Sequence, residues 1–326
     1  MKYRKFGSLD WNISEIGLGC WQIGADWGKV SEEKANEVLQ SSFENGVNFF
    51  DTADVYGDGK SEKFLGKLIK STSQKIYVST KTGLRLRPHI PEAYNLKNIE
   101  KFIDRSLINL GIDCIDLLQL HCPPPQMCSK KEIYEIMDEL VIKGKIAYYG
   151  VTVFNLSEAM DAIQFPNVKS IQLVFNIFRQ KPIEVFFKKA KKRNVAIIAR
   201  GPLASGLLTG TINKETKFTP NDHRNYNFTG KAFDIGDTFS GVNFDKGLEA
   251  VEKLKKLLPA NYSLTDLALK WILAHDEVSV VIPGATNKSQ VQMNTNASDL
   301  EDISFLLPKI NSIYDELIKS DVHGRW

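Results

Sequence analysis

The sequence predicts an α/β protein that forms a single (β/α)8 TIM barrel over residues 1–326. The first observation is a strand-then-helix unit that recurs along the chain, with helices marked by one-sided apolar spacing. The second is that the strand runs are short, β-branched and mostly non-alternating, which is typical of parallel sheets buried on both faces. The third is their number, because eight such strands favour a closed barrel over an open sheet.

An N-terminal β-hairpin is expected over roughly residues 2–13, with its turn at Gly7-Ser8. The eight strand runs that follow are 16–19, 47–50, 75–80, 115–120, 146–151, 170–175, 195–199 and 278–282. The helices expected after the first six strands run from 32 to 45, 61 to 70, 96 to 110 and 129 to 143, from Ser157 and from Pro182. A long irregular segment, about 201–245, follows the seventh strand, and segments this long are usually functional or disordered. Helices are expected next over about 247–258, 264–275 and, as an extra C-terminal element, 307–319.

Residue types at the ends of these runs support the helix boundaries. Ser31 is a typical N-cap, and Glu32 and Glu33 follow it in the first turn, where acidic side chains are favourable. Gly46 and Gly111 follow the last apolar position of their helices, where glycine commonly ends a helix.

A doubly wound sheet is the competing fold, and it should carry a dinucleotide fingerprint after its first strand. The stretch from Gly17 to Gln22 begins correctly but lacks the third glycine. The triplet 59–61 (Gly-Lys-Ser) resembles the end of a phosphate-binding loop, but Asp54 stands where the upstream glycine should be. The barrel therefore remains the preferred fold.

Composition and charge argue against nucleic acid or a membrane as a partner. The net charge is +3, and the basic run Lys188–Arg193 falls on an expected helix, where it reads as a solvated face. No apolar run approaches the roughly 20 residues of a membrane span, and the N-terminal residues lack a signal-like apolar region. The four cysteines form no C-x-x-C pair and are expected to be reduced thiols. A cytoplasmic location is expected.

Four chemically capable side chains follow the carboxyl ends of consecutive strands, where barrel active sites lie. They are Asp51, Tyr56, Lys81 and His121. A phenol alone has a pKa near 10, so we expect Lys81 to stabilise its anion and lower that pKa. Asp51 would hold Lys81, and His121 would hydrogen-bond a substrate oxygen or relay a proton. This set suits protonation of an oxygen during carbonyl reduction.

Each of these residues also has an ordinary structural explanation, such as a helix cap, a solvated charge, a turn or packing. Their joint occurrence at successive strand ends is what favours a catalytic site. Candidates for the substrate pocket are less distinct, because an aromatic residue in a loop is as readily explained by packing, and an arginine there by solvation. These candidates are Trp21, Trp27, Phe154 and Phe228 as apolar walls, and Arg85 and Arg87 as partners of an acidic or phosphorylated substrate.

Together, these motifs resemble the aldo-keto reductase family over nearly the whole chain. The matching pieces are residues 51–57 (Asp-Thr-Ala-Asp-Val-Tyr-Gly), 79–81, 118–121, 150–152, 201–206, 208–210 and 282–285. The resemblance implies a (β/α)8 barrel that binds a nicotinamide cofactor across its rim, without a Rossmann domain. It also implies that Tyr56 is the general acid, with Asp51, Lys81 and His121 in support. Hydride would pass from the nicotinamide C4 to a carbonyl carbon.

The resemblance further implies a set of cofactor-binding residues. Thr152 and Gln172 match residues that hold the carboxamide, Arg200 lies where an aromatic side chain often stacks on the nicotinamide, and Lys288 is the basic residue nearest the expected 2′-phosphate. The remaining members of the set, along the loop over the pyrophosphate and at the adenosine end, are Gly201, Pro202, Leu203, Ser205, Gly206, Leu208, Ile282, Gly284, Thr286, Gln290 and Asn294.

Three positions depart from the family pattern. Val153 replaces a usual asparagine and cannot hydrogen-bond the carboxamide, a task that Asn155 could take over. The planar guanidinium of Arg200 can also stack. The usual Lys or Arg against the 2′-phosphate is absent apart from Lys288 nearby. NADP(H) is the expected cofactor on the family pattern, and NAD(H) is the alternative.

The expected activity is therefore NAD(P)(H)-dependent reduction of small aldehydes, ketones or sugar carbonyls, or the reverse alcohol oxidation. The alternative is a nicotinamide-binding regulatory subunit with little turnover, resembling the channel β subunits of this family. A metal-dependent hydrolase is disfavoured, because only His121 among 5 histidines lies at a clear strand end, so no metal is expected. The sequence does not indicate the substrate or the oligomeric state.

Overall fold

Eight parallel strands form the centre of the protein in this computed structural model, which describes residues 1–24, 27 and 30–326. They lie side by side in chain order, from β3 to β10. Backbone hydrogen bonds from Gly17 to Val281 (2.8 Å) and from Val281 to Glu15 (3.0 Å) join the first strand to the last and close the barrel. The strands are β3 (Leu18–Gly19), β4 (Phe49–Asp51), β5 (Tyr77–Thr82), β6 (Ile115–His121), β7 (Ile146–Thr152), β8 (Val168–Val174), β9 (Ala196–Arg200) and β10 (Val278–Val281). The predicted (β/α)8 barrel is confirmed.

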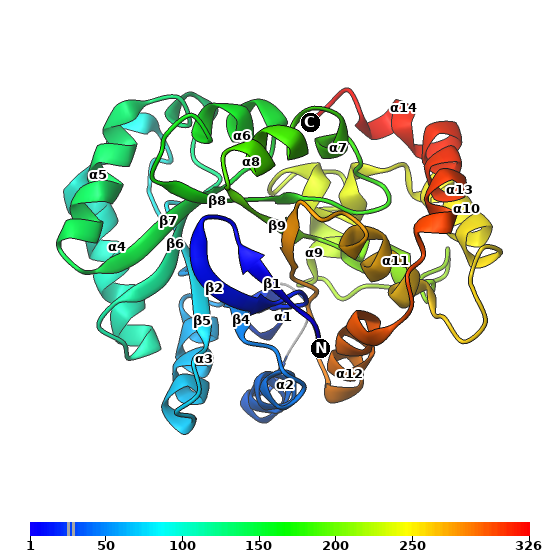
Figure 1. The fold of residues 1–326 in the computed structure, drawn as a ribbon, viewed down its shortest axis with the longest axis horizontal. Helices are drawn as coiled ribbons and strands as arrows, with labels where there is room; N and C mark the ends of the chain where they lie inside the picture. The colour runs from blue at the N-terminus through cyan, green and yellow to red at the C-terminus, as the bar shows by residue number, and fades with distance from the viewer. Residues whose placement is uncertain (25–26, 28–29) are drawn as a thin grey trace.

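Helices surround this barrel, and their apolar faces pack on the strands in one extensive core (Figure 1). None of the described helices is long and apolar enough to cross a membrane. Their bounds are α1 (Trp21–Gly24), α2 (Glu32–Glu44), α3 (Lys60–Ser71), α4 (Leu96–Leu110), α5 (Lys131–Ile142), α6 (Leu156–Ala162), α7 (Pro182–Val185), α8 (Phe187–Lys192), α9 (His223–Tyr226), α10 (Phe244–Lys255), α11 (Leu264–Leu273), α12 (Lys288–Asn296), α13 (Leu307–Ile313) and α14 (Lys319–Val322).

The N-terminal hairpin covers one end of the barrel, as its strands β1 (Tyr3–Phe6) and β2 (Leu9–Ser14) show in Figure 1. Phe6 and Ile13 are buried there against inward-facing residues of the strands, such as Phe49 and Leu117. This second apolar cluster fills the amino end of the barrel. Polar chemistry is therefore left to the opposite end, where the strands terminate.

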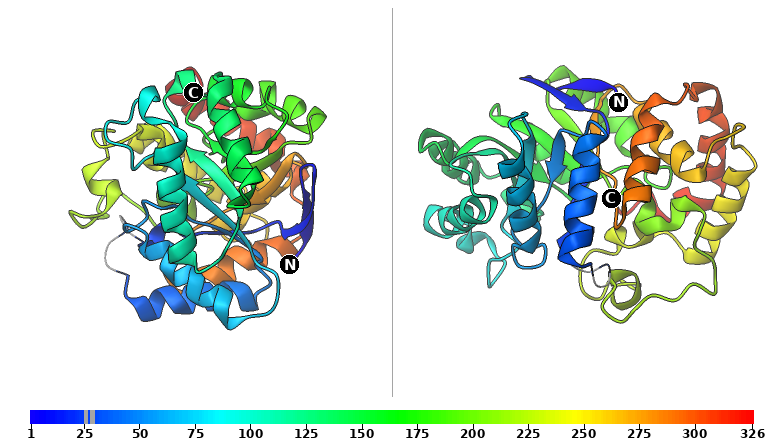
Figure 2. Two further views of the ribbon diagram at one scale, coloured as in Figure 1. Left: turned by 90° about the vertical axis from the view of Figure 1, so that its left-hand side faces the viewer. Right: turned by 90° about the horizontal axis from the view of Figure 1, so that it is seen from below.

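The long segment after β9 lies at that opposite end, away from the hairpin (Figure 2). It contains short helical turns at Ala204–Thr209, Ile235–Asp237 and Phe239–Gly241, together with α9. It is irregular, as expected, but folded, because Asn227 and Thr238 are buried and hydrogen-bonded to one another within it (3.0 Å). The segment forms part of the wall around the strand ends.

Several expected boundaries were wrong for identifiable reasons. Helix α3 begins at Lys60, with Gly59 as its N-cap, rather than at Ser61. The Ser61 hydroxyl is buried and donates to the Cys20 carbonyl oxygen (2.9 Å). The helix opening at Pro182 divides at Phe186 into α7 and α8. The extra C-terminal helix is present, but a π-helical turn at Tyr314–Ile318 separates α13 from α14. Helix α12 was not expected.

Candidate active site

The four predicted catalytic residues meet at the carboxyl end of the barrel. Asp51 is the last residue of β4, Lys81 lies within β5, and His121 is the last residue of β6. The Lys81 ammonium is fully buried, 2.5 Å from a carboxylate oxygen of Asp51, and it donates to the hydroxyl of Tyr56 at 3.4 Å. The rings of Tyr56 and His121 are 6.0 Å apart, edge to face. The barrel topology thus brings together groups from three strands.

The Asp51 carboxylate is surrounded by hydrogen-bond donors. One oxygen accepts from Lys81, and the other accepts from Ser79 (3.0 Å), Gln119 (3.2 Å) and Gln172 (2.8 Å). A buried charge needs partners of this kind to offset the loss of water. Asp51 therefore acts as a fixed anchor for Lys81.

The Tyr56 hydroxyl remains protonated at neutral pH. Burial raises the pKa of Tyr56 to about 12, although Lys81 lowers it in part. The expected effect of Lys81 is present, but desolvation of the phenolate outweighs it, so the expected net lowering was wrong. For Lys81 the balance is reversed, because burial lowers its pKa while Asp51 and Tyr56 raise it above its ordinary value. The pair is a neutral phenol beside a charged ammonium.

His121 is held in its neutral form at the same site. Burial and the nearby charges of Lys81 and Arg200 lower the pKa of His121 well below its usual value. Its Nδ1 atom is buried and has no hydrogen-bond partner among the described residues. A neutral imidazole can donate a hydrogen bond to a substrate oxygen, but it is a poor source of a proton.

Predicted cofactor residues occupy the next three strand ends. Thr152 ends β7, Gln172 lies on β8, and Arg200 ends β9. The guanidinium of Arg200 forms an ion pair with Asp237 of the long segment and donates to the carbonyl oxygen of Val153 at 3.4 Å. Arg200 is thus fixed from two sides at the edge of the catalytic group.

The remaining predicted cofactor residues form two loops on either side of this edge. In the first loop, Gly201 has a positive φ of 61°, and an added Cβ would meet only Val174, at 3.7 Å. In the second loop, Thr286 donates its backbone N–H to Gln290 at 2.8 Å, while Asn294 donates to the carbonyl oxygen of Gly284 at 3.2 Å. Pro202, Leu208 and Ile282 are buried, Leu203, Ser205 and Gly206 are half-buried, and Lys288 is exposed at the start of α12.

Aromatic side chains cover Tyr56. The Trp21 ring is stacked with the Tyr56 ring at 6.1 Å between centroids. Trp27 and His223 lie beside Trp21, with centroids 5.9 Å and 4.8 Å from it. Phe233 from the long segment adds to this wall at 6.0 Å from Trp21. The site therefore has aromatic side chains against the Tyr56 ring and charged groups, Lys81 and Asp51, at its hydroxyl.

Other predicted pocket residues lie differently. The Phe154 ring is 5.7 Å from the Arg200 guanidinium, so it borders the site. Phe228 is exposed and packs on Phe239 and Phe244, away from the catalytic group. The guanidinium of Arg87 donates to the backbone oxygens of Leu84 and Leu86.

Arg85 is engaged by the loop that carries Tyr56. It donates to the carbonyl oxygen of Asp54 (3.2 Å) and pairs with Asp58 (2.5 Å). Arg105 makes the same two kinds of contact, at 3.3 Å and 2.7 Å. Both arginines therefore fix the position of the loop, and Arg85 is not presented as an open substrate ligand.

Asp54 leads to a prediction about stability. It is fully buried, and both carboxylate oxygens lack a hydrogen-bond partner among the described residues. Burial and the charge of Glu62 raise the pKa of Asp54 from 3.8 to about 7, although Arg85 and Arg105 lower it in part. The folded protein then binds more protons than the unfolded chain between about pH 4 and pH 7, so stability falls as the pH rises. We expect Asp54→Asn to stabilise the protein at pH 8, by at most about 4 kcal/mol, and to lose this advantage toward pH 4.

Urea unfolding of both proteins across this pH range is the measurement. The same substitution at the exposed Asp113 controls for the loss of one negative charge. A stability difference between Asp54→Asn and the natural protein that stays constant with pH would contradict the assignment.

Sequence reasoning missed several residues of the site. Ser79 and Gln119 had a usable signal, because they are polar residues inside otherwise buried strands. His223, Phe233 and Asp237 had none, because their place depends on the path of the long segment. No group of three or more His, Cys, Asp or Glu that could hold a metal ion occurs in residues 1–24, 27 and 30–326.

Comparisons with known proteins agree with this arrangement. The model of the Aldo/keto reductase family matches residues 15–305. Aldo-keto reductase YhdN of Bacillus subtilis is 31% identical, covering 97% of this chain and 96% of the relative. Aldo-keto reductase yakc [NADP(+)] of Schizosaccharomyces pombe is 32% identical, covering 90% and 86%. The holo structure of aldo-keto reductase AKR11C1 from Bacillus halodurans has a TM-score of 0.77 at 27% identity, covering 100% and 99%.

The barrel, the group at its strand ends and these similarities over nearly the whole chain lead to one assignment. The chain belongs to the aldo/keto reductase family and is an NAD(P)-dependent oxidoreductase.

Proposed function

We propose that the protein reduces aldehydes, ketones or sugar carbonyls, or oxidises the corresponding alcohols, with Tyr56 as the general acid. The observation that carries this proposal is the contact between the Tyr56 hydroxyl and the Lys81 ammonium, partly buried at the strand ends. A protonated phenol beside a fixed cation can give up its proton when negative charge develops on a nearby oxygen.

In this mechanism the substrate oxygen accepts hydrogen bonds from Tyr56 and from the neutral His121. A bound reduced nicotinamide supplies the hydride that reaches the carbonyl carbon. As charge develops on the oxygen, Tyr56 donates its proton, and the phenolate that results is stabilised by Lys81. Asp51 keeps Lys81 charged and in position, and the aromatic wall around Trp21 excludes water from the reacting atoms.

The residues around the site fit a nicotinamide dinucleotide. Gln172 uses its amide N–H on Asp51, and its carbonyl oxygen makes no hydrogen bond among the described residues, so it can accept from a carboxamide. Gly201 leaves an open backbone cradle beside Arg200. We propose that Thr152 and Gln172 hold the carboxamide, that Arg200 stacks on the ring, and that the loops 201–208 and 282–294 hold the pyrophosphate and the adenosine.

NADP(H) is the proposed cofactor, and Lys288 is the proposed partner of its 2′-phosphate. The name of the yakc relative, which includes NADP(+), supports this choice. Lys288 is exposed at the first position of α12, where the backbone N–H groups of the helix also favour an anion. The proposal also includes a single barrel domain over residues 1–326, small-molecule substrates and a cytoplasmic location.

Replacing Lys288 with Met tests the cofactor assignment. We expect the dissociation constant for NADPH to rise about fivefold to tenfold, because a single exposed ion pair contributes about 1 kcal/mol. The constant for NADH should change by less than about twofold, since NADH lacks the phosphate. Fluorescence titration of both cofactors measures this, with Lys309→Met, an exposed lysine on α13, as the control. Equal effects on both cofactors would refute the role of Lys288.

A panel of aldehydes, ketones and sugars with the preferred cofactor tests the activity itself. We expect oxidation of the reduced cofactor that depends on the carbonyl compound. Tight cofactor binding without oxidation across the panel would instead favour the alternative, a regulatory subunit resembling the channel β subunits.

A further inference from the structure

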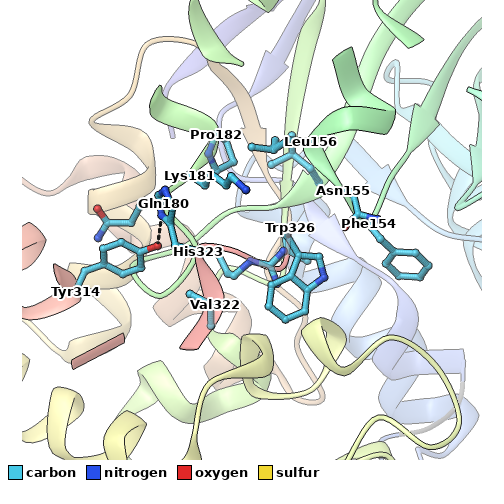
Figure 3. A pocket seen from close by; sticks show the side chains of 13 residues that line it. Phe154, Asn155, Leu156, Gln180, Lys181, Pro182, Tyr314, Val322, His323 and Trp326 are labelled. Atoms are coloured by element: carbon cyan, nitrogen blue, oxygen red, sulfur yellow. Dashed lines mark hydrogen bonds between the residues drawn. The ribbon is translucent and has the colours of Figure 1, made fainter. Parts of the chain in front are cut away.

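A small cavity lies near the active site, between the segments after β7 and β8 and the end of the chain (Figure 3). Phe154 and Asn155 line it from the first segment, and Arg179 and Lys181 from the second. Trp326 closes it from the C-terminal side. None of the assigned catalytic steps uses this cavity.

Arg179 is the unexplained group in the cavity wall. It is only 7% exposed, and its guanidinium makes no hydrogen bond and no ion pair with any described residue. The Trp326 ring is stacked on it at 3.6 Å, and burial, together with the charge of Arg200, lowers the pKa of Arg179 to about 9. A buried guanidinium without an acceptor is costly, so Arg179 is suited to bind an anion.

Asp234 and Asp237 act on Arg179 electrostatically, but neither forms an ion pair with it. Asp237 pairs with Arg200, and Asp234 accepts hydrogen bonds from the Trp326 indole at 3.2 Å and from the backbone N–H of Gly236 at 2.7 Å. The side chain of Lys181 likewise has no hydrogen bond or ion pair within the described part of the chain, so the wall carries two cations without a partner.

The size of the cavity selects the kind of anion. The centres of water-sized molecules fit into only about 20 Å³, which is room for one or two waters or for a carboxylate group. The other walls are mainly apolar, including Phe154, Leu156 and Pro182. A planar carboxylate matches the fork of a guanidinium with two parallel hydrogen bonds, and an apolar chain suits the remaining walls.

The position of the cavity relates this anion to the reaction. Phe154 lines the cavity, and its ring is 5.7 Å from the Arg200 guanidinium. Arg200 in turn contributes to the electrostatic field at Tyr56. Phe154 and Arg200 therefore link the wall of the cavity to the surroundings of the phenol.

We propose that Arg179 and Lys181 bind the carboxylate end of an acidic carbonyl substrate, whose aldehyde group lies at Tyr56. The substrate class is that of ω-oxo acids with an unbranched apolar chain. This inference rests on the proposed carbonyl reduction and adds the specificity of the same site.

Matched substrates provide the test. The ratio of kcat/KM is measured for each ω-oxo acid and the plain aldehyde of equal length, from 4-oxobutanoate with butanal to 8-oxooctanoate with octanal. We expect one chain length at which the acid is preferred by about tenfold or more, as a bidentate charged contact can provide. Arg179→Met should bring that ratio to about one, because it keeps an apolar chain under Trp326 but removes the charge.

Two further variants keep the test decisive. Lys181 is partly exposed, so Lys181→Met should lower the ratio less than Arg179→Met does. It replaces Arg179→Met in the test if that variant does not fold. Lys189→Met, on the outer face of α8, should leave the ratio unchanged. Equal kcat/KM for acid and aldehyde at every length in the natural protein would overturn the inference.

A binding measurement separates this inference from the proposed function. If no carbonyl compound is reduced, the proposed function fails. Calorimetric titration with adipate then tests separately whether the cavity binds a carboxylate. Binding of one adipate per chain that is lost in Arg179→Met would support a carboxylate site, occupied by a free acid rather than a substrate. No adipate binding would show that water alone satisfies Arg179, and the inference would fail as well.

Discussion

Replacing Tyr56 with Phe is expected to lower kcat for carbonyl reduction by about 10³-fold, within the range that general acid catalysis contributes. The substitution removes the hydroxyl and leaves the ring, so the stacking on Trp21 and the shape of the site are retained. Lys81 and Asp51 keep their 2.5 Å contact. The dissociation constant of the cofactor should therefore change by less than about twofold.

Single-turnover measurements with saturating cofactor test this expectation, because they separate the chemical step from product release. Tyr134→Phe is a suitable control, since that buried tyrosine donates to the carbonyl oxygen of Cys128 (2.8 Å) on the outside of the barrel. If the Tyr56 variant turned over at the natural rate, a different group would have to supply the proton.

The second large effect is expected when Lys81 is replaced with Met. Lys81 and Asp51 are both buried, and removing one partner of such a pair leaves an uncompensated charge, at a cost of about 3–5 kcal/mol of stability. Turnover should also fall strongly, because the phenolate formed from Tyr56 loses its stabilising cation.

The double variant Asp51→Asn with Lys81→Met distinguishes the two roles. With both charges removed, we expect the free energy of unfolding to recover in part, as it does when a buried pair is replaced together. Turnover should stay low, because the cation near Tyr56 is still missing. Chemical denaturation and steady-state kinetics of Lys81→Met, Asp51→Asn and the double variant measure both effects. Stability losses that simply add would show that the two side chains do not act as a pair.

The meeting of the four proposed catalytic residues could be predicted from the sequence because barrel topology places them. Asp51, Tyr56, Lys81 and His121 each follow or end a recognisable strand, and the fold brings all such ends to one rim. The hairpin was predictable for a similar reason, since its pattern is local. Glycines such as Gly111, at the left-handed φ of 65°, likewise identified a helix end.

Other features depended on the three-dimensional path of the chain. The ion pair of Arg200 with Asp237 joins residues 37 positions apart through a segment without a regular pattern. The stacking of Trp326 on Arg179 joins residues that are even farther apart in the sequence. The direction of the Tyr56 pKa shift could not be predicted from the sequence for another reason. Burial raises this pKa and the Lys81 charge lowers it, and only the structure shows which effect is larger.

The most direct test of the central claim follows deuterium from the cofactor to the substrate. The natural protein is incubated with NADPH carrying deuterium at both hydrogen positions of the nicotinamide C4 and with an aldehyde that it reduces, and the alcohol is examined by mass spectrometry. The account predicts transfer of one deuterium to the former carbonyl carbon in the natural protein, at a rate about 10³-fold lower in Tyr56→Phe. Alcohol formed without deuterium, or at equal rates in both proteins, would contradict it.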